Sequence, residues 1–380
     1  MPHSTHSLNT TISTERLHMA LDLGGETWKL GFVAGPGKPR IRTIPARDMV
    51  QLQCEVGKAK RRFKLAEDAP VVSCYEAGPD GFWVHRMLEK LGIANVVVDP
   101  SSIEVERRRR TRKTDRLDAS KLVAHLVRYH SGEQRVWSTA QVPSEEQEDA
   151  RRLHRERERL QKEKKQHMSR IASLLATQGC ASSRRSDSWK RWDGQSLPPD
   201  LRGELERELA RLELVRKQLR EVEQERSRRL ADQSSPQMAQ VGLLASLRGV
   251  GPTSAWLLVM EMFGWRRYQN RRTAGSLAGL TGTPFASGGK TREQGISKAG
   301  SARVRTLMVE LSWLWLRYQP QSELSRWFKE RWSGSGRLRR IGIVAMARRL
   351  FIDLWRLVEH GLVPPGAEFK PSAEFKPSQG

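Results

Sequence analysis

The sequence predicts an α/β domain followed by mainly helical regions, and three observations support this α/β plus α class. Residues 17–130 alternate short apolar runs with helical patterns. Residues 143–235 are highly charged and carry a narrow apolar seam at helical spacing, and residues 241–362 are helical and more apolar. We therefore expect domains at 17–135, 143–235 and 241–362, with a flexible N-terminus (1–16) and a disordered tail (363–380).

The first domain begins with three runs that can pair as a meander, LHMALDL, TWKLGFVA and PRIRTIP. Two buried-strand runs, APVVSCYE and IANVVVD, then alternate with helical segments, the last of which is TDRLDASKLVAHLVRYH. Helices between consecutive strands are typical of parallel pairing, whereas a meander is antiparallel. The sequence therefore predicts a sheet that mixes both kinds of strand.

The middle region predicts a long antiparallel coiled-coil arm. Its first helix opens with a capping box formed by Ser144 and Gln147. Its second helix places apolar residues close to heptad spacing at Leu205, Leu209, Leu212, Leu219 and Val222. Most of the charge belongs to solvated helix faces, and the apolar seam is the expected interface of a homo-oligomer, a dimer or a tetramer.

The third region contains LRGVGPTSA (247–255), which resembles the turn of a helix-hairpin-helix motif. The backbone amides of such a turn can hold a phosphate, although many similar turns are only tight connections. Tryptophan-rich helices follow, and their spacing is more typical of a core than of base-stacking platforms. The chain ends with two copies of AEFKPS, residues 367–372 and 373–378, to which we assign no function.

Composition favours a polyanionic partner. The 380 residues include 67 Lys and Arg against 43 Asp and Glu, a formal net charge of +24. Such an excess favours nucleic acid, because neutralised phosphates release condensed counterions. No apolar run approaches a membrane span, the N-terminus lacks an apolar signal segment, and the three cysteines fit neither a disulfide framework nor a zinc knuckle. We expect a cytoplasmic protein without a membrane partner.

Two aspartates interrupt the most basic stretch of the chain, RRRRTRKTDRLDASKL. Asp115 and Asp118 are three residues apart, so a helix places them on one face, and a divalent cation would relieve their repulsion. Asp22 and Glu76 each end a predicted strand, where α/β proteins build sites. Carboxylates without His or Cys suit Mg²⁺ or Mn²⁺, which promote phosphodiester cleavage. The basic residues expected to bring phosphates to these acids are Arg107, Arg108, Arg109, Arg110, Arg112, Lys113 and Arg116.

Each acid also has an ordinary structural interpretation. Asp115 can cap the helix, and Asp118 can pair with Arg112 or Lys121. Asp22 and Glu76 can be simple strand-end residues. Asp99 is a rival fourth ligand, although its place before Pro100 is typical of a turn.

Four segments together resemble the DEDD-motif transposases of bacterial insertion sequences, relatives of Piv-type DNA invertases. These segments, spread between about residues 17 and 355, are ALDLGGETWKLGFV, CYEAGPDGFWVHRMLEKLGI, VVDPSSIEVERRRRTRKTDRLDASKLVAHLVRY and SLAGLTGTPFASGGKTREQGISKAGSARVRTLMVELSWLWLRYQP. The resemblance implies an RNase H-like (RuvC-type) N-terminal domain whose motif maps onto Asp22, Glu76, Asp115 and Asp118. It further implies a helical transposase domain, a bridge RNA that pairs with donor and target DNA, and a circular intermediate.

The resemblance also implies a nucleophilic serine in a Ser-Gly motif, which Ser287 matches. Ser287 precedes two glycines, where a backbone can approach a phosphate closely. Lys290, Arg292 and Lys298 could stabilise charge during attack, and Arg303 and Arg305 are further expected nucleic-acid contacts. Ser297 is the rival serine. In the segment ISKAGSARVR, Ser301 stands where relatives usually carry Asn, which weakens any role assumed for that amide.

These features favour a transposase that cuts and rejoins DNA through a 5′-phosphoserine intermediate. One alternative is a metal-dependent nuclease of resolvase type, in which Ser287 belongs to a phosphate-contacting loop without covalent chemistry. The other is a basic nucleic-acid-binding protein without activity.

Overall fold

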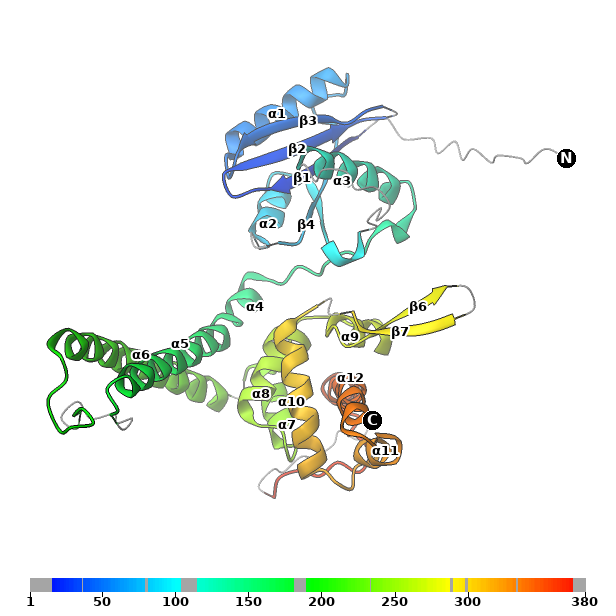
Figure 1. Ribbon diagram of the computed structural model, residues 1–380. Helices are drawn as coiled ribbons and strands as arrows, with labels where there is room; N and C mark the ends of the chain where they lie inside the picture. Colours follow the sequence, from blue (N-terminus) through cyan, green and yellow to red (C-terminus); the bar gives the residue numbers. More distant parts are fainter. Residues whose placement is uncertain are drawn as a thin grey trace. The chain divides into compact units, whose positions relative to one another are not determined.

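The chain forms two compact units, Met1–Val142 and Pro143–Gly380 (Figure 1). The computed structural model describes residues 16–35, 37–78, 81–103, 115–180, 189–232, 234–287, 290–297, 300–332 and 334–371. Residues 1–15, which make up nearly all of the expected flexible N-terminus, lie outside this description.

The first unit is built on a five-stranded mixed sheet, which confirms that part of the predicted fold. Its strand order is β3-β2-β1-β4-β5, antiparallel within β3-β2-β1 and parallel within β1-β4-β5. The strands are β1 (Leu17–Leu23), β2 (Thr27–Val33), β3 (Arg40–Pro45), β4 (Val71–Glu76) and β5 (Ala94–Val98). The more specific RNase H-like assignment stays a prediction.

Helices cover both faces of this sheet. Side chains alternate along a strand, so β1 directs Leu17, Met19 and Leu21 to one face and Ala20 to the other. The first face packs against α1 (Met49–Arg62) and α2 (Trp83–Lys90). The second packs against α3 (Asp115–His130), and short 3₁₀ turns, Pro100–Ser102 and Gln134–Val136, connect the elements.

The second unit begins with α4 (Glu145–Asp149), whose predicted capping box between Ser144 and Gln147 is present. Two long helices follow, α5 (Arg152–Ala176) and α6 (Pro199–Ala231). Leu160 packs with Val215, Leu219 and Val222, whereas the later residues Ile171 and Leu175 pack with the earlier Leu205 and Leu212. The two helices are therefore antiparallel, as predicted, while coiled-coil geometry and oligomerisation through this pair stay predictions.

The remaining helices surround one apolar core that contains the buried Trp256, Trp315 and Phe351. They are α7 (Pro236–Ser246), α8 (Pro252–Leu258), the π-helix η4 (Val259–Phe263), α9 (Arg271–Leu277), α10 (Ala302–Tyr318), α11 (Glu323–Trp332) and α12 (Gly336–His360). Between α9 and α10, β6 (Gly282–Ser287) and β7 (Lys290–Ile296) form a two-stranded hairpin. Trp315 donates its indole N–H to Ser322 Oγ at 2.9 Å inside this core, so it is a structural residue.

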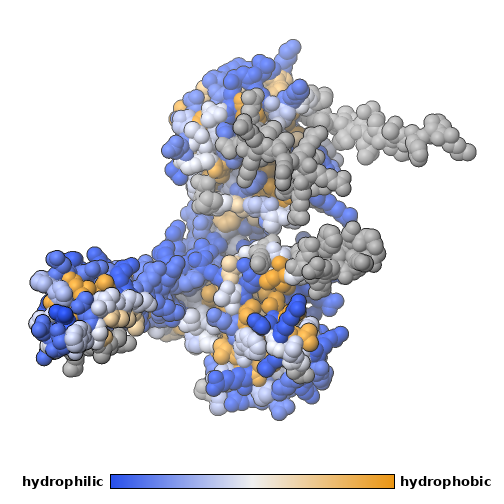
Figure 2. Space-filling model, in the orientation of Figure 1, coloured by the Kyte–Doolittle hydropathy of each residue, from blue (hydrophilic) through white to orange (hydrophobic). Residues whose placement is uncertain are grey.

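No helix in the described part of the chain has both the length and the apolar character that a membrane span requires. Figure 2 shows that the visible face exposes mainly hydrophilic side chains, with apolar side chains in small patches.

The expected disordered tail is wrong for residues 363–371. Phe369 forms an antiparallel bridge with Leu247 in the turn between α7 and α8, and Arg248 N donates to Glu368 O at 3.0 Å. Lys370 Nζ donates to Ala245 O at 2.5 Å and to Val250 O at 2.9 Å, which caps exposed carbonyls of the turn. Low complexity suggested disorder, but these contacts lie about 120 residues away in sequence and no local pattern reports them. Residues 372–380 lie outside the description.

Deleting one AEFKPS copy removes nothing that the fold needs, because deleting 367–372 or 373–378 produces the same sequence and leaves one copy after Gly366. We expect this variant to melt as the parent does. Deleting both copies should lower the melting temperature by several degrees, because the bridge and the Lys370 contacts are lost. Equal melting of all three proteins in calorimetry would show that the docked segment contributes no stability.

Candidate functional site

Asp22 and Glu76 lie side by side at one edge of the sheet. β1 and β4 are parallel, and their register pairs Leu21 with Tyr75, the residues immediately before the two acids. Alternation places Asp22 on the face of Ala20, and Glu76 on the face of Cys74. Both acids therefore belong to the face covered by α3, at the carboxyl ends of their strands.

Three contacts set the position and direction of α3 on this face. Gly31, which pairs with Ala20, has no side chain, and a Cβ there would lie 2.8 Å from the carbonyl oxygen of Ala119. The Cys74 thiol donates to Leu122 O at 3.8 Å. At the far end of the helix, the rings of His130 and His18 have centroids 5.5 Å apart. Because His18 starts β1, α3 runs antiparallel to β1, and its first turn lies toward the strand ends.

The first turn of α3 contains the backbones of Asp115 and Asp118. The structure thus brings the segments that carry all four predicted acids to the same edge of one unit. The side chains of Asp115 and Asp118 lie outside the description, as do residues 104–114 with most of the basic stretch, Arg107 to Arg110, Arg112 and Lys113. Arg116 is placed only by its backbone in α3. Among the side chains that the structure does describe, none form a metal-binding group of three or more His, Cys, Asp or Glu.

The electrostatics of the two sheet edges differ. Burial and the nearby Glu76 charge raise the pKa of the Cys74 thiol well above its ordinary value, so this thiol stays protonated. Burial, together with His130 and Arg16, lowers the pKa of His18 to about 4, so this ring is neutral at pH 7. Neutral His18 therefore adds no positive charge at the opposite edge of the sheet.

Asp99, the rival ligand, has a turn role. Its Oδ1 accepts hydrogen bonds from Ser101 N at 2.9 Å and Ser101 Oγ at 2.8 Å, and it caps the 3₁₀ turn that follows β5. This matches the turn interpretation of Asp99.

Ser287 is the last residue of a β-strand. The two glycines that follow it had suggested that it lies in a loop. β6 and β7 form an antiparallel hairpin in which Ser287 pairs with Lys290 and Phe285 pairs with Arg292. Ser297 N donates to Thr281 O at 2.8 Å and closes the base of this hairpin. Side chains on both strands from position 283 to 294, and residues 288, 289 and 298 entirely, lie outside the description. The predicted phosphate contacts of Lys290, Arg292 and Lys298 therefore stay predictions.

The residues after the hairpin serve the fold. Ser301 is the N-cap of α10, and its hydroxyl accepts from Val304 N at 3.4 Å. Arg303 forms an ion pair with Glu158 of α5, so its charge is used within the protein and not only for nucleic acid as expected. Arg305 also takes part in an interaction within the chain.

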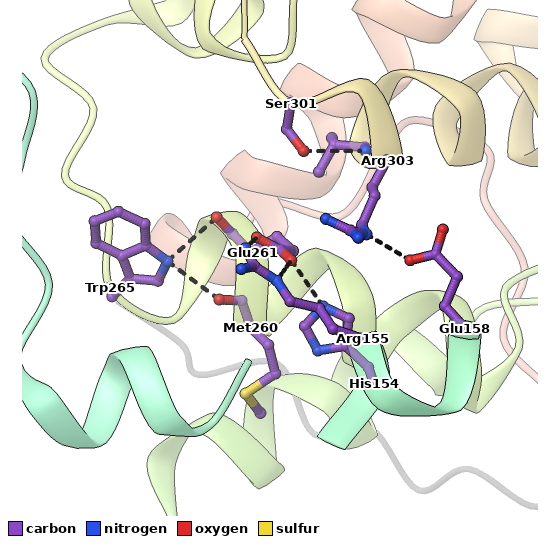
Figure 3. A network of polar contacts seen from close by, with 9 residues as sticks. His154, Arg155, Glu158, Met260, Glu261, Trp265, Ser301 and Arg303 are labelled. Atoms are coloured by element: carbon purple, nitrogen blue, oxygen red, sulfur yellow. Dashed lines mark hydrogen bonds and ion pairs between the residues drawn. The ribbon is translucent and has the colours of Figure 1, made fainter. Parts of the chain in front are cut away.

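The sequence interpretation missed a buried polar cluster where α5 meets η4 (Figure 3). Glu261 accepts from His154 Nε2 at 2.8 Å and from Arg155 Nε and Nη2 at 2.7 and 2.8 Å. The Trp265 indole N–H donates to the carbonyls of Met260 and Glu261. Burial opposes ionisation of Glu261, but the hydrogen bonds from His154 and Arg155 outweigh it and lower the pKa to about 2. An acid inside the apolar run LLVMEMFGW was the available signal.

Comparison with known proteins gives a consistent group of relatives. The profile of the transposase IS116/IS110/IS902 family matches residues 241–325. The protein y4rJ of Sinorhizobium fredii, named as a candidate transposase, is 38% identical over 93% of this chain and 94% of its own length. The transposase for insertion sequence element IS1328 of Yersinia enterocolitica is 27% identical over 58% of this chain and 66% of its own. The transposase for IS1533 of Leptospira borgpetersenii is 22% identical over 78% and 85%.

Gly31→Ala tests the close approach of α3. The added methyl group meets the Ala119 carbonyl oxygen, so the helix must move from the sheet. We expect a loss of about 1–3 kcal/mol in the free energy of unfolding, measured by denaturant titration. Gly25→Ala is the matched control, because a Cβ at that exposed turn meets nothing within 4 Å. Equal stability of the two variants would contradict the tight packing of α3.

Glu261→Gln tests the buried cluster through its pH dependence. A carboxylate with a lowered pKa stabilises the fold above its unfolded value near 4.5, and this contribution disappears as the pH falls toward 2. The variant should therefore lose about 3 kcal/mol at pH 7 and progressively less below pH 4.5. Glu330→Gln, at an exposed site on α11, should change little at either pH. A deficit that is the same at pH 7 and pH 3 would rule out the charge as its cause.

Proposed function

The chain belongs to the IS116/IS110/IS902 family of transposases, and we propose that it cuts and rejoins DNA with metal-bound acids and the nucleophile Ser287. In this proposal the acids of the first unit and the serine of the second contribute to one reaction. The family membership supports DNA transposition in general terms.

One observation carries the proposal: α3 begins at the sheet edge where β1 and β4 present Asp22 and Glu76. Carboxylates in proximity repel one another and raise the free energy of the folded state. A divalent cation bound between them would offset that repulsion.

The donor set fits Mg²⁺ or Mn²⁺. Asp22, Glu76, Asp115 and Asp118 offer carboxylate oxygens, and the described part of this edge provides only a buried, protonated Cys74 as a softer donor. These four residues would hold the ion. When bound, it stabilises negative charge on phosphate oxygens during cleavage.

Ser287 would then perform the covalent step. Its Oγ attacks a backbone phosphorus, the P–O3′ bond breaks, and a 5′-phosphoserine and a free 3′-hydroxyl result. The proton of the serine hydroxyl ends on the departing O3′. Attack by another 3′-hydroxyl reverses the step and joins a new pair of strands, so no external energy source is required. A position at the end of β6, before two glycines, suits a phosphate that must approach the backbone closely.

Partners follow from this chemistry and from the charge of the chain. Donor and target DNA are the substrates, and we include a bridge RNA from the element as the guide that pairs with both. Joining two duplexes requires more than one set of nucleophiles, so we propose a homo-oligomer held by α5 and α6. A bacterial cytoplasm, where such an element and its RNA reside, is the proposed location.

A covalent adduct between protein and DNA tests the function. Full-length protein, DNA with the native flanks of the gene and RNA transcribed from those flanks should give a phosphoserine adduct that a denaturing gel detects. Ser287→Ala should abolish it, whereas Ser297→Ala should not, because Ser297 acts in the hairpin base through its backbone N–H.

The acids have their own outcome in the same assay. Asp115→Asn with Asp118→Asn should abolish both the adduct and strand cleavage. Cleavage that survives Ser287→Ala but not this acid pair would indicate the resolvase-type nuclease. Cleavage unaffected by either change would exclude both enzymatic interpretations.

A further inference from the structure

The base of the Ser287 hairpin borders a cavity of about 680 Å³ in the second unit. Gly282, where β6 begins, and Gly295 and Ile296, where β7 ends, form its rim together with α9, α11 and α12. The hairpin that carries the candidate nucleophile therefore also contributes residues to this cavity.

Five arginines line this cavity, and none of its described lining residues is an acid: Arg271, Arg272, Arg340, Arg348 and Arg349. Across the described residues, none of these guanidinium groups is part of an ion pair. Asp353 and Glu323 line a separate, smaller cavity, which shares Arg271 and Arg349 with this one. Five cations with so little compensation repel one another, and a polyanion would remove that repulsion.

The arrangement of Arg348 shows that the cavity is built into the helices. A Cβ on Gly275 would lie only 2.9 Å from Arg348 Nε. The absence of a side chain at Gly275 therefore leaves room for the Arg348 guanidinium against α9. Arg349 lies over the ring of Trp327, with its Cζ 4.2 Å from the ring centroid. Both cations are thus positioned by neighbouring helices.

The floor of the cavity is apolar, which separates it from an ordinary phosphate-binding surface. The residues concerned are Leu280, Ile296, Trp327, Ile341, Val344 and Ile352. Ile341 keeps half of its surface exposed, although a large apolar side chain gains by burial. Unpaired bases have apolar faces that stack on such surfaces, whereas bases inside a duplex are already stacked and cannot reach a floor.

We propose that this cavity binds unpaired nucleotides of the DNA strand that carries the phosphate attacked by Ser287. The arginines hold the phosphates, and the apolar floor holds a base. β6 has six residues and spans about 17 Å at 3.3 Å per residue. A strand stacked as in a duplex advances about 3.4 Å per nucleotide, and an extended strand advances further, so the bound nucleotides lie at most about five positions from the cut. The assignment of the strand rests on the proposed function.

Binding of a fluorescent 12-nucleotide oligothymidine, followed by anisotropy with full-length protein in EDTA, tests the cavity. Arg272→Ala with Arg340→Ala should weaken binding at least tenfold, because two charge-assisted phosphate contacts are lost. The slope of log K against log salt should fall by about 1.4. Arg326→Ala with Arg337→Ala removes the same charge from exposed positions outside the cavity and should change affinity less than twofold. Trp327→Leu should weaken binding of the single-stranded oligothymidine without changing the salt slope, because it removes an apolar contact and no charge.

The outcomes separate the possibilities. Equal losses in the cavity and control variants, or an equal loss for a 12-base-pair duplex, would overturn the proposal in favour of general electrostatic attraction. If the cavity variant lost affinity for an oligouridine RNA more than for the oligothymidine, the choice of DNA as the ligand would be overturned. Arg272→Lys with Arg340→Lys should restore the salt slope, and unchanged melting curves will show that the variants fold. The binding measurement in EDTA does not require catalysis. Loss of the adduct with intact single-strand binding would therefore contradict the proposed function alone, whereas loss of cavity-dependent binding would contradict this proposal alone.

Discussion

The close packing of α3 on the sheet is the constraint on which the candidate site depends. A helix normally approaches a sheet at a distance set by side chains, but here Gly31, which pairs with Ala20, faces the carbonyl oxygen of Ala119. The small residues let the backbone of α3 approach closely at one point, and the ring contact between His18 and His130 fixes its direction. Only with this direction does the acidic first turn of α3 reach the edge occupied by Asp22 and Glu76. A helix of opposite direction would place the same acids at the edge where β1 begins.

Buried carboxylates perform a comparable task in the second unit. Glu208 of α6 accepts from His167 at 2.6 Å and from Arg170 at 2.9 Å, both on α5. Glu261 ties the beginning of α5 to η4, as described above. The apolar seam between α5 and α6 attracts without direction, whereas a buried carboxylate with two donors accepts only one alignment. These acids therefore define the register of the helices, a role that apolar contacts alone do not supply.

The arginines of the chain differ in how far nearby acids neutralise their charge. Along α6, arginines pair with glutamates three or four residues away, as Arg202 does with Glu206 and Arg229 with Glu225. Such exposed pairs contribute little stability, but they neutralise the local field. Among the described residues, the arginines of the cavity below the hairpin form no ion pair of this kind, although the charge of Arg349 acts on Asp353 and opposes the rise in its pKa that burial causes. Within the described residues, five arginines whose charge is little compensated therefore lie together at the base of the Ser287 hairpin.

Sequence alone was sufficient for the mixed sheet, the antiparallel helix pair and the capping box at Ser144, because local patterns of apolar spacing, turn residues and helix caps indicate each of them. The strand-end acids were recognisable only as part of a joint pattern with Asp115 and Asp118, since each acid alone also has an ordinary structural interpretation. Three features required the tertiary structure: the role of Gly31, the hydrogen bonds that ionise Glu261, and the docking of Phe369 and Lys370 on a turn over 100 residues earlier. Each depends on partners that are distant in sequence, and local periodicity contains no information about such distances. The arginine-lined cavity belongs with them, because α9, α11 and α12 contribute residues that become neighbours only when the core has formed.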